Sequence, residues 1–270
     1  MAILKALGLA SRVTDRAAQK AWLSVVSLVA IILVWGLLSG IGVIKPSFAP
    51  SPGGFVKAFV LFWAHGYEGT SPWREVGISL MQVVVGLGAG IVVGVPTGLA
   101  MGYNRGVEAM LVPVFSFLRP IPPLAFIPLA ILYLGIGQFA KIVVIFGAAL
   151  LYVTLSSYMG ARSVPKEYVY LSRNLQLSGP RVLLTVLVPA AMPSILSGIR
   201  TATAICWATV VAAELIGAQS GLGYMIENAS TFNQVSVVFV ALFLLGVIGF
   251  GLDWGVASLQ RRFVHWEGRH

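Results

Sequence analysis

Long apolar runs separated by short polar stretches make up most of the chain. A helix needs about 20 apolar residues to cross the hydrocarbon core of a bilayer. Six segments meet this requirement: 22–44, 76–102, 109–134, 142–161, 188–213 and 235–252. The first follows a basic leader, but it is longer than the apolar part of a signal peptide and no A-x-A cleavage site follows it. The pattern therefore predicts an all-α integral membrane protein with six transmembrane helices.

The composition agrees with embedding in a membrane. Of the 270 residues, 58% are hydrophobic and only 10% are charged, and the mean hydropathy is +0.90, whereas a soluble domain has about a quarter of its residues charged. The net charge of +9 would suggest nucleic acid in a soluble protein. Basic loops that orient membrane proteins explain it here, so we expect no nucleic-acid partner. The single cysteine, Cys206, excludes an internal disulfide and a multi-thiolate metal site, and we expect no metal.

The basic residues predict which side of the membrane each loop faces. With the N-terminus inside, 12 Lys and Arg residues lie in the cytoplasm, 4 lie outside and 2 lie within spans, which together make the 18 in the chain. Both termini are therefore expected in the cytoplasm. The predicted regions are a cytoplasmic segment 1–21, a transmembrane domain 22–256 with an external segment 45–75 and a cytoplasmic loop 162–187, and a cytoplasmic tail 257–270.

Glycine recurs at every fourth position of the second span. Positions four apart share one face of a helix, and a face without side chains lets a neighbouring helix approach closely. We interpret this ridge as a packing surface within the subunit, with a seam that slides as the alternative. The ridge consists of Gly86, Gly90, Gly94, Gly98 and Gly102.

The third span contains the string RPIPPLAF at 119–126, whose prolines cannot sit in an unbroken helix. A broken helix at membrane depth is tolerated where protein or a water-filled cavity satisfies the freed carbonyls. Charges within the membrane are functional candidates by default, and the alternatives are an arginine that snorkels to the surface or pairs with the glutamate. The candidates for a solute path are Arg119, Pro122, Pro123, Arg200 and Glu214.

The cytoplasmic loop 162–187 is much longer than two neighbouring spans require. A short helix is expected to begin after Pro165, and Tyr168, Leu171 and Leu175 fall on one of its faces. An amphipathic helix outside the membrane suits docking into a groove of a partner protein. The alternative is a helix that lies on the lipid surface.

This loop resembles the cytoplasmic signature loop of bacterial ABC-importer permeases. That pattern is roughly Glu-Ala-Ala, three residues, Gly, and further on Ile-x-Leu-Pro; here Tyr170-Leu171-Ser172 and Gln176 stand at its Glu-Ala-Ala and Gly positions, and Leu187-Val188-Pro189 at its end. RPIPPLAFIPLAILYLGIGQFAKI (119–142) and WATVVAAELIGAQSGLGYMI (207–226) are similar to taurine, alkanesulfonate and nitrate importer permeases. LQRRFVHW (259–266) is most similar to the taurine branch, and the resemblance covers about 22–266.

The resemblance implies a permease of the type I ABC-importer fold in the bacterial cytoplasmic (inner) membrane. It implies a second copy of this chain, two cytoplasmic ATPase subunits, and a periplasmic or lipid-anchored solute-binding protein as partners, besides membrane lipid. No cofactor is expected in this chain, because ATP and Mg²⁺ would bind the ATPase subunits. The residues expected to couple to the ATPase are Glu167, Tyr168, Tyr170, Leu171, Ser172, Leu175, Gln176, Ser178 and Gly179.

The solute and the class of transporter leave alternatives open. The resemblance favours a small anion, taurine or another sulfonate first, with nitrate, bicarbonate and a thiamine-precursor pyrimidine also possible. An enzyme is not expected, since the sequence has no HExxH motif, no nucleophile arrangement and no Walker A motif. The alternative of a different class is a secondary transporter or channel without an ATPase partner. Such proteins often carry paired broken helices, and only one strong break is evident here.

Overall fold

The computed structural model describes residues 22–23 and 25–264, and their fold is all-helical, as the sequence predicts. Between the helices, a single isolated bridge joins Tyr67 to Thr70. The helices are α2 (Pro52–His65), α3 (Pro72–Tyr103), α4 (Arg105–Leu118), the 3-10 turn η1 (Pro123–Phe126), α5 (Ile127–Leu134), α6 (Gln138–Arg162), α7 (Lys166–Asn174), α8 (Gly179–Val182), the π-helical turn η2 (Leu183–Leu187), α9 (Val188–Leu215), α10 (Leu222–Thr231) and α11 (Val235–Phe263).

Four helices in the described residues are long and apolar enough to cross a membrane: Pro72–Tyr103, Gln138–Arg162, Leu183–Leu215 and Val235–Phe263. A fifth crossing arises if α4 and the η1–α5 pair, which meet at a bend of 88°, form one broken span. The predicted first span contains the shorter apolar helix Val25–Gly40. Six spans therefore remain a prediction, and the segment 1–21 lies outside the described residues.

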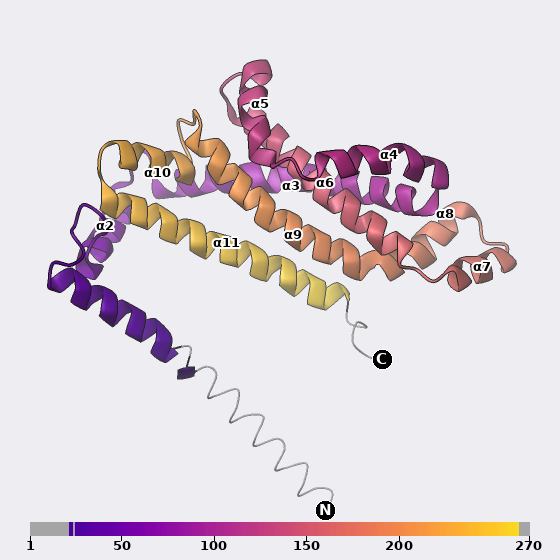
Figure 1. Ribbon diagram of the computed structural model, residues 1–270, viewed down its shortest axis with the longest axis horizontal. Helices are drawn as coiled ribbons and strands as arrows, with labels where there is room; N and C mark the ends of the chain where they lie inside the picture. Colours follow the sequence, from indigo (N-terminus) through magenta and orange to yellow (C-terminus); the bar gives the residue numbers. More distant parts are fainter. Residues whose placement is uncertain (1–21, 24, 265–270) are drawn as a thin grey trace, which may run out of the picture.

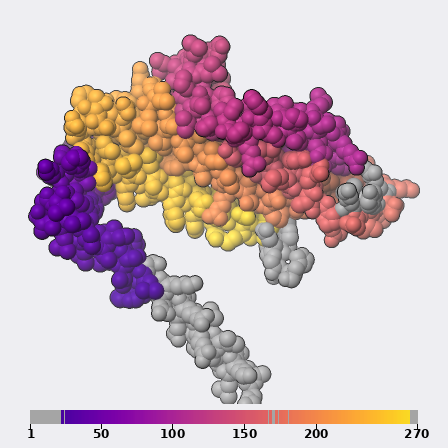
Figure 2. Space-filling view, in the orientation of Figure 1, coloured from indigo at the N-terminus to yellow at the C-terminus, as the bar shows by residue number. Residues whose placement is uncertain are grey.

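The long helices run side by side along the length of the molecule (Figure 1). α2 and α10 lie at one end of this bundle and α7 and α8 at the other, while α5 projects from its side. The helix Val25–Gly40 leaves the α2 end and points away from the body, as the space-filling view also shows (Figure 2). The external segment and the cytoplasmic loop of the predicted topology thus fall at opposite ends.

Several helices begin where the sequence supplies a cap. Ser51 and Ser71 accept hydrogen bonds from the backbone N–H groups of Gly54 (3.2 Å) and Arg74 (3.3 Å), and each serine is followed by a proline at the first helical position. Serine satisfies a free N–H there, and proline has no N–H to satisfy. Ser51 thus begins the short helix α2 within the predicted external segment, and Ser71 begins the long helix α3.

Small residues bring α3, α6 and α9 close together. A Cβ atom placed on Gly90 would lie 2.3 Å from the Cβ of Ala149, and one placed on Gly98 would lie 2.3 Å from the carbonyl oxygen of Thr154. On the other side of α6, a Cβ on Gly198 would lie 2.1 Å from the Cβ of Ser156. Membrane helices pack through van der Waals contact between close backbones. All five glycines of the α3 ridge lie against α6: Gly86, Gly90, Gly94, Gly98 and Gly102.

Candidate functional site

The proline string breaks the helix where the sequence predicts. α4 ends at Leu118, Pro122 has an extended backbone (ψ 131°), and Pro123 starts the 3-10 turn that leads into α5. A single proline removes one N–H donor and clashes with the preceding turn, and α3 continues through Pro96; three prolines within four positions break the helix here. The break directs α5 out of the bundle and leaves an exposed corner beside Arg119 (Figure 1).

Arg119 occupies the C-cap of α4, and its backbone N–H donates to the carbonyl of Phe115 at 2.9 Å. Its side chain is exposed and forms no hydrogen bond or ion pair with any residue that the structure describes. An arginine always carries its charge and offers five donors in a planar fork. Arg119 is therefore available to an anion.

An apolar cavity of about 440 Å³ lies between the broken helix and α6. Leu118 and Pro123 line it beside the break, Tyr133 lines it from α5, and Ala148 lines it from α6. The lining carries no charged side chain. Arg119 follows Leu118 in the chain but does not itself line this cavity.

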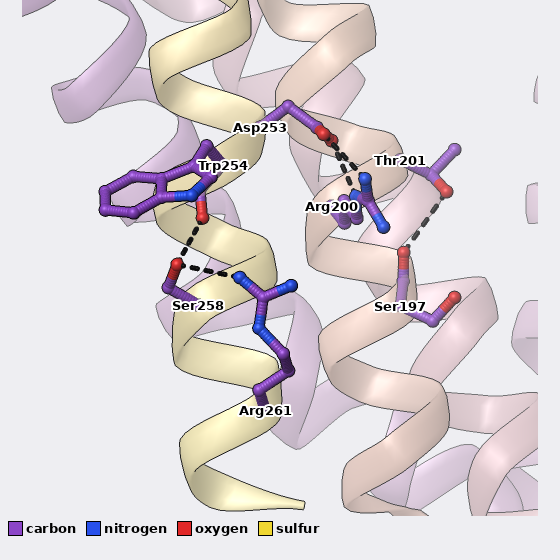
Figure 3. A network of polar contacts seen from close by, with 7 residues as sticks. All are labelled: Ser197, Arg200, Thr201, Asp253, Trp254, Ser258 and Arg261. Atoms are coloured by element: carbon purple, nitrogen blue, oxygen red, sulfur yellow. Dashed lines mark hydrogen bonds and ion pairs between the residues drawn. The ribbon is translucent and has the colours of Figure 1, made fainter. Parts of the chain in front are cut away.

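Arg200, the second intramembrane arginine, is paired. Its Nε and Nη2 atoms donate to Oδ1 and Oδ2 of Asp253, both at 2.6 Å (Figure 3). The side chains remain 47% and 43% exposed, so the pair lies on the surface shared by α9 and α11. A two-pronged arginine–carboxylate pair is geometrically specific and neutralises both charges. Arg200 is therefore less available to a solute than Arg119.

Polar groups continue from this pair toward the C-terminal end of α11. The hydroxyl of Ser258 donates to the carbonyl of Trp254 at 2.7 Å and accepts from Nη2 of Arg261 at 3.2 Å (Figure 3). On α9, the hydroxyl of Thr201 donates to the carbonyl of Ser197 at 3.1 Å. These residues place polar side chains and an ion pair on neighbouring parts of α9 and α11.

Glu214 lies away from both arginines. It is only 1% exposed, it accepts a hydrogen bond from the hydroxyl of Ser79 at 2.7 Å and another from the backbone N–H of Gly223 at 2.8 Å. Both ion pairs in the described structure, Arg162–Glu108 and Arg200–Asp253, leave it out. The structure thus places Glu214 inside a packed cluster, and the alternative in which an arginine pairs with this glutamate is not seen in the described residues.

The loop predicted to be cytoplasmic contains α7, a two-turn helix at the end of the molecule (Figure 1). Tyr168, Leu171 and Leu175 are 56%, 56% and 73% exposed, whereas Ser172 is buried at 3%. Exposed apolar side chains on one face of a short helix are typical of a surface that a partner covers. Glu167, Ser178 and Gly179 are exposed as well, and the side chain of Tyr170 lies outside the described part of the structure.

Gln176 follows α7 with a positive φ of 55°. The N–H of Leu177 donates to the carbonyl of Ser172 at 3.1 Å, and the N–H of Leu175 to that of Leu171 at 3.0 Å. A residue in the left-handed region with a bond between positions five apart is the Schellman ending of a helix, a place where glycine is favoured. This geometry gives a physical reason for a glycine at the position that Gln176 occupies.

Comparisons with known proteins agree with one another. The family model described as binding-protein-dependent transport system inner membrane component matches residues 86–265. The taurine transport system permease protein TauC of Escherichia coli (strain K12) is 34% identical over 247 residues, which cover 91% of this chain and 90% of that protein. The putative aliphatic sulfonates transport permease protein SsuC of the same strain is 35% identical and covers 88% of this chain and 89% of its own.

Two further matches extend the comparison. The bicarbonate transport system permease protein CmpB of Synechococcus elongatus is 36% identical over 190 residues, 70% of this chain and 68% of that protein. A chain of the MetNI methionine ABC transporter, solved in inward-facing conformations, superposes with a TM-score of 0.62 at 20% identity, covering 70% of this chain and 94% of its own. At that identity the likeness concerns the fold alone.

Proposed function

The chain belongs to the family of binding-protein-dependent transport system inner membrane components, and on that premise we propose that it carries a small anion inward, with taurine or another sulfonate as the first candidate. It is a multi-pass permease subunit of a bacterial ABC importer rather than an enzyme, and ATP hydrolysis belongs to a separate subunit. The fold shared with the MetNI chain agrees with the type I importer fold that the resemblance implied.

The observation that carries the anion proposal is the unpaired, exposed guanidinium of Arg119 at the break between α4 and η1. A sulfonate has three acceptor oxygens, and a planar guanidinium donates to such groups through two parallel bonds. The relatives named for taurine and for aliphatic sulfonates favour this solute class. The relative named for bicarbonate makes that anion the second candidate.

The assembly proposed around this chain follows the family. A second copy would complete the conduit, with Arg119, Pro122 and Pro123 facing it from each subunit and Arg200 near its cytoplasmic half. Two ATPase subunits would dock on α7, whose exposed apolar face suits a groove. A solute-binding protein would act at the opposite, external end. The helix Val25–Gly40 would supply the sixth span, so that both termini lie in the cytoplasm.

The test is uptake by vesicles that hold this chain with its co-purified ATPase and a candidate binding protein, given labelled taurine with and without ATP. We expect accumulation that depends on ATP and on the binding protein. ATPase activity stimulated by the loaded binding protein, without taurine uptake, would redirect the solute assignment to bicarbonate or nitrate. A chain that purifies without any ATPase would contradict the importer assembly.

Arg119 is tested in the same vesicles. Arg119→Ala removes the charge and is expected to lower uptake by about tenfold or more, since a hydrogen bond to a charged group contributes about 1.5–3 kcal/mol. Arg119→Lys keeps the charge but loses the planar fork, so its uptake should lie between the two. Wild-type uptake by the alanine variant, with the complex intact, would remove Arg119 from the path.

A further inference from the structure

The N-terminus of α10 is capped by side chains of other helices. α10 has no capping side chain of its own, because Gly221 precedes it. The backbone N–H of Gly221 donates to Oε2 of Glu75 at 2.5 Å, that of Leu222 to the hydroxyl of Ser79 at 3.0 Å, and that of Gly223 to Oε2 of Glu214 at 2.8 Å. Three successive N–H groups are thus satisfied from α3 and α9, whereas a helix usually meets this need from within its own sequence.

The cluster is closed to solvent. Glu75, Ser79 and Glu214 are each 1% exposed or less, and the Ser79 hydroxyl donates back to Glu214, 2.7 Å from Oε1 and 2.9 Å from Oε2. Two carboxyl groups in an apolar bundle are costly unless charges and donors compensate them. The positive end of the α10 dipole and the buried side chain of Lys141 on α6, which attracts Glu214, offset part of that cost.

Gly221 packs closely against the carboxyl group of Glu214. Its φ of 111° is one that side-chain-bearing residues rarely adopt, and a Cβ at this position would lie 2.3 Å from the carboxyl carbon of Glu214. The loop between α9 and α10 also reaches the connection between α5 and α6, where a Cβ on Gly217 would lie 3.9 Å from Ile136. Glu214 therefore lies directly beneath the loop 216–221, with its carboxylate against the loop backbone.

α10 has a second attachment on its other side. The hydroxyl of Tyr67 donates to Oδ1 of Asn228 at 2.6 Å, and the hydroxyl of Tyr224 donates to Oε2 of Glu68 at 3.0 Å. Burial, and then the nearby Glu68, raise the pKa of Tyr67 to about 12, so it remains a donor at physiological pH. These bonds and the apolar contacts with α11 hold α10 through residues outside the carboxylate cluster.

From this geometry we infer that Glu214 is a positioning residue for transport: with Glu75 and Ser79 it holds α10 and the loop 216–221 in place at the end of the bundle opposite α7. The inference rests on the proposed function, in which that end is the external mouth of the permease. The cluster joins α3, α6, α9 and α10 at one point, so its loss frees the loop while the helices below remain packed.

The test uses two variants and one matched control. Glu214→Gln keeps the shape but removes the charge, and Ser79→Ala removes the bridging hydroxyl. The control, Glu227→Gln, changes an exposed glutamate on α10 whose side chain bonds to no described residue. Each is combined with Ala218→Cys, a half-buried reporter in the loop, and labelled with a membrane-impermeant maleimide in the assembled complex. The native Cys206 is fully buried and contributes little background.

We expect labelling at position 218 to quicken, and uptake to fall, by about tenfold in both cluster variants, the size of effect that follows loss of a hydrogen bond to a charged group. The double variant should be no worse than either single one, because the two residues act as a unit. The Glu227→Gln control should match the parent. Unchanged labelling, or uptake that falls only as the yield of folded complex falls, would overturn the inference. Labelling needs no solute, so it still decides if the proposed solute is wrong.

Discussion

At Gln176 the backbone turns left-handed to end α7, and a side chain in that conformation costs about 1–2 kcal/mol. The turn belongs to the loop that is proposed to meet the ATPase. A local cost at a helix end is felt as fraying of that helix, because helix ends open without unfolding the rest of a protein. The stability of α7 is thus set partly by one backbone angle.

Gln176→Gly is expected to stabilise α7 by about 1 kcal/mol, since glycine adopts a positive φ without strain. Hydrogen exchange of the α7 backbone amides should slow by about fivefold. Ser178→Gly, outside the left-handed region, is the control and should not slow exchange. An equal effect of both variants would mean that the φ angle is not the cause.

The charged residues within the spans also show what the sequence can and cannot predict about a single side chain. Arg119, Arg200 and Glu214 stand out in the sequence because they interrupt apolar spans. Their partners could not be read from it, since Asp253 lies 53 residues from Arg200 and Ser79 lies 135 residues from Glu214. Short-range patterns carry no information about which distant helix comes to face a side chain.

α3 packs against α6 through its glycine ridge, and the two glycines at 88 and 90 allow a matched test. Gly90→Ala would push a Cβ to 2.3 Å from Ala149, whereas Gly88→Ala meets nothing within 4 Å. Overpacking typically costs about 1–3 kcal/mol, while alanine is intrinsically the better helix former. Thermal unfolding of the purified complex should therefore show destabilisation for Gly90→Ala only. Equal stability of the two variants would show that α3 and α6 can move apart at Gly90 at little cost in free energy.

α7 permits a second prediction for an element. Changing Tyr168, Leu171 and Leu175 to Asp places charges on the exposed apolar face, where a partner's groove would have to desolvate them. We expect the ATPase to be lost from the purified complex while the permease stays folded. Asn174→Asp, which adds a charge to the same helix outside the residues expected to couple to the ATPase, serves as the control. An ATPase that stays bound to the triple variant would place docking elsewhere.

Elements were easier to predict than their ends. The apolar runs located α3, α6, α9 and α11, and the proline string located the break before η1. The predicted span 235–252 covers only part of α11, which continues to Phe263 and includes Asp253, the partner of Arg200 on the neighbouring helix. A polar residue ends an apolar pattern in the sequence without ending the helix.

On the scale of the whole molecule, the predicted orientation remains to be measured. Glu227, at the α10 end, and Ser178, near α7, are both exposed and lie at opposite ends of the bundle. With an impermeant maleimide, Glu227→Cys should be labelled in spheroplasts and Ser178→Cys only in inverted vesicles, because basic residues favour the cytoplasmic side. The reverse pattern would invert the topology and place α7 out of reach of an ATPase.

The glycine ridge repeats the same small residue at every fourth position, so the ridge alone does not fix the register of α3 against α6. Gly86 to Gly102 face Ile145, Ala149, Val153, Ser157 and Ala161, so both edges repeat every four residues, a step of about 6 Å along a helix. A repeat of this kind allows several registers, each displaced by four residues, and does not select one of them. The register is selected by contacts outside the repeat, such as the Gln82–Gln138 hydrogen bond between α3 and α6. One specific contact at the end of the repeat is enough to fix the register of the whole helix pair.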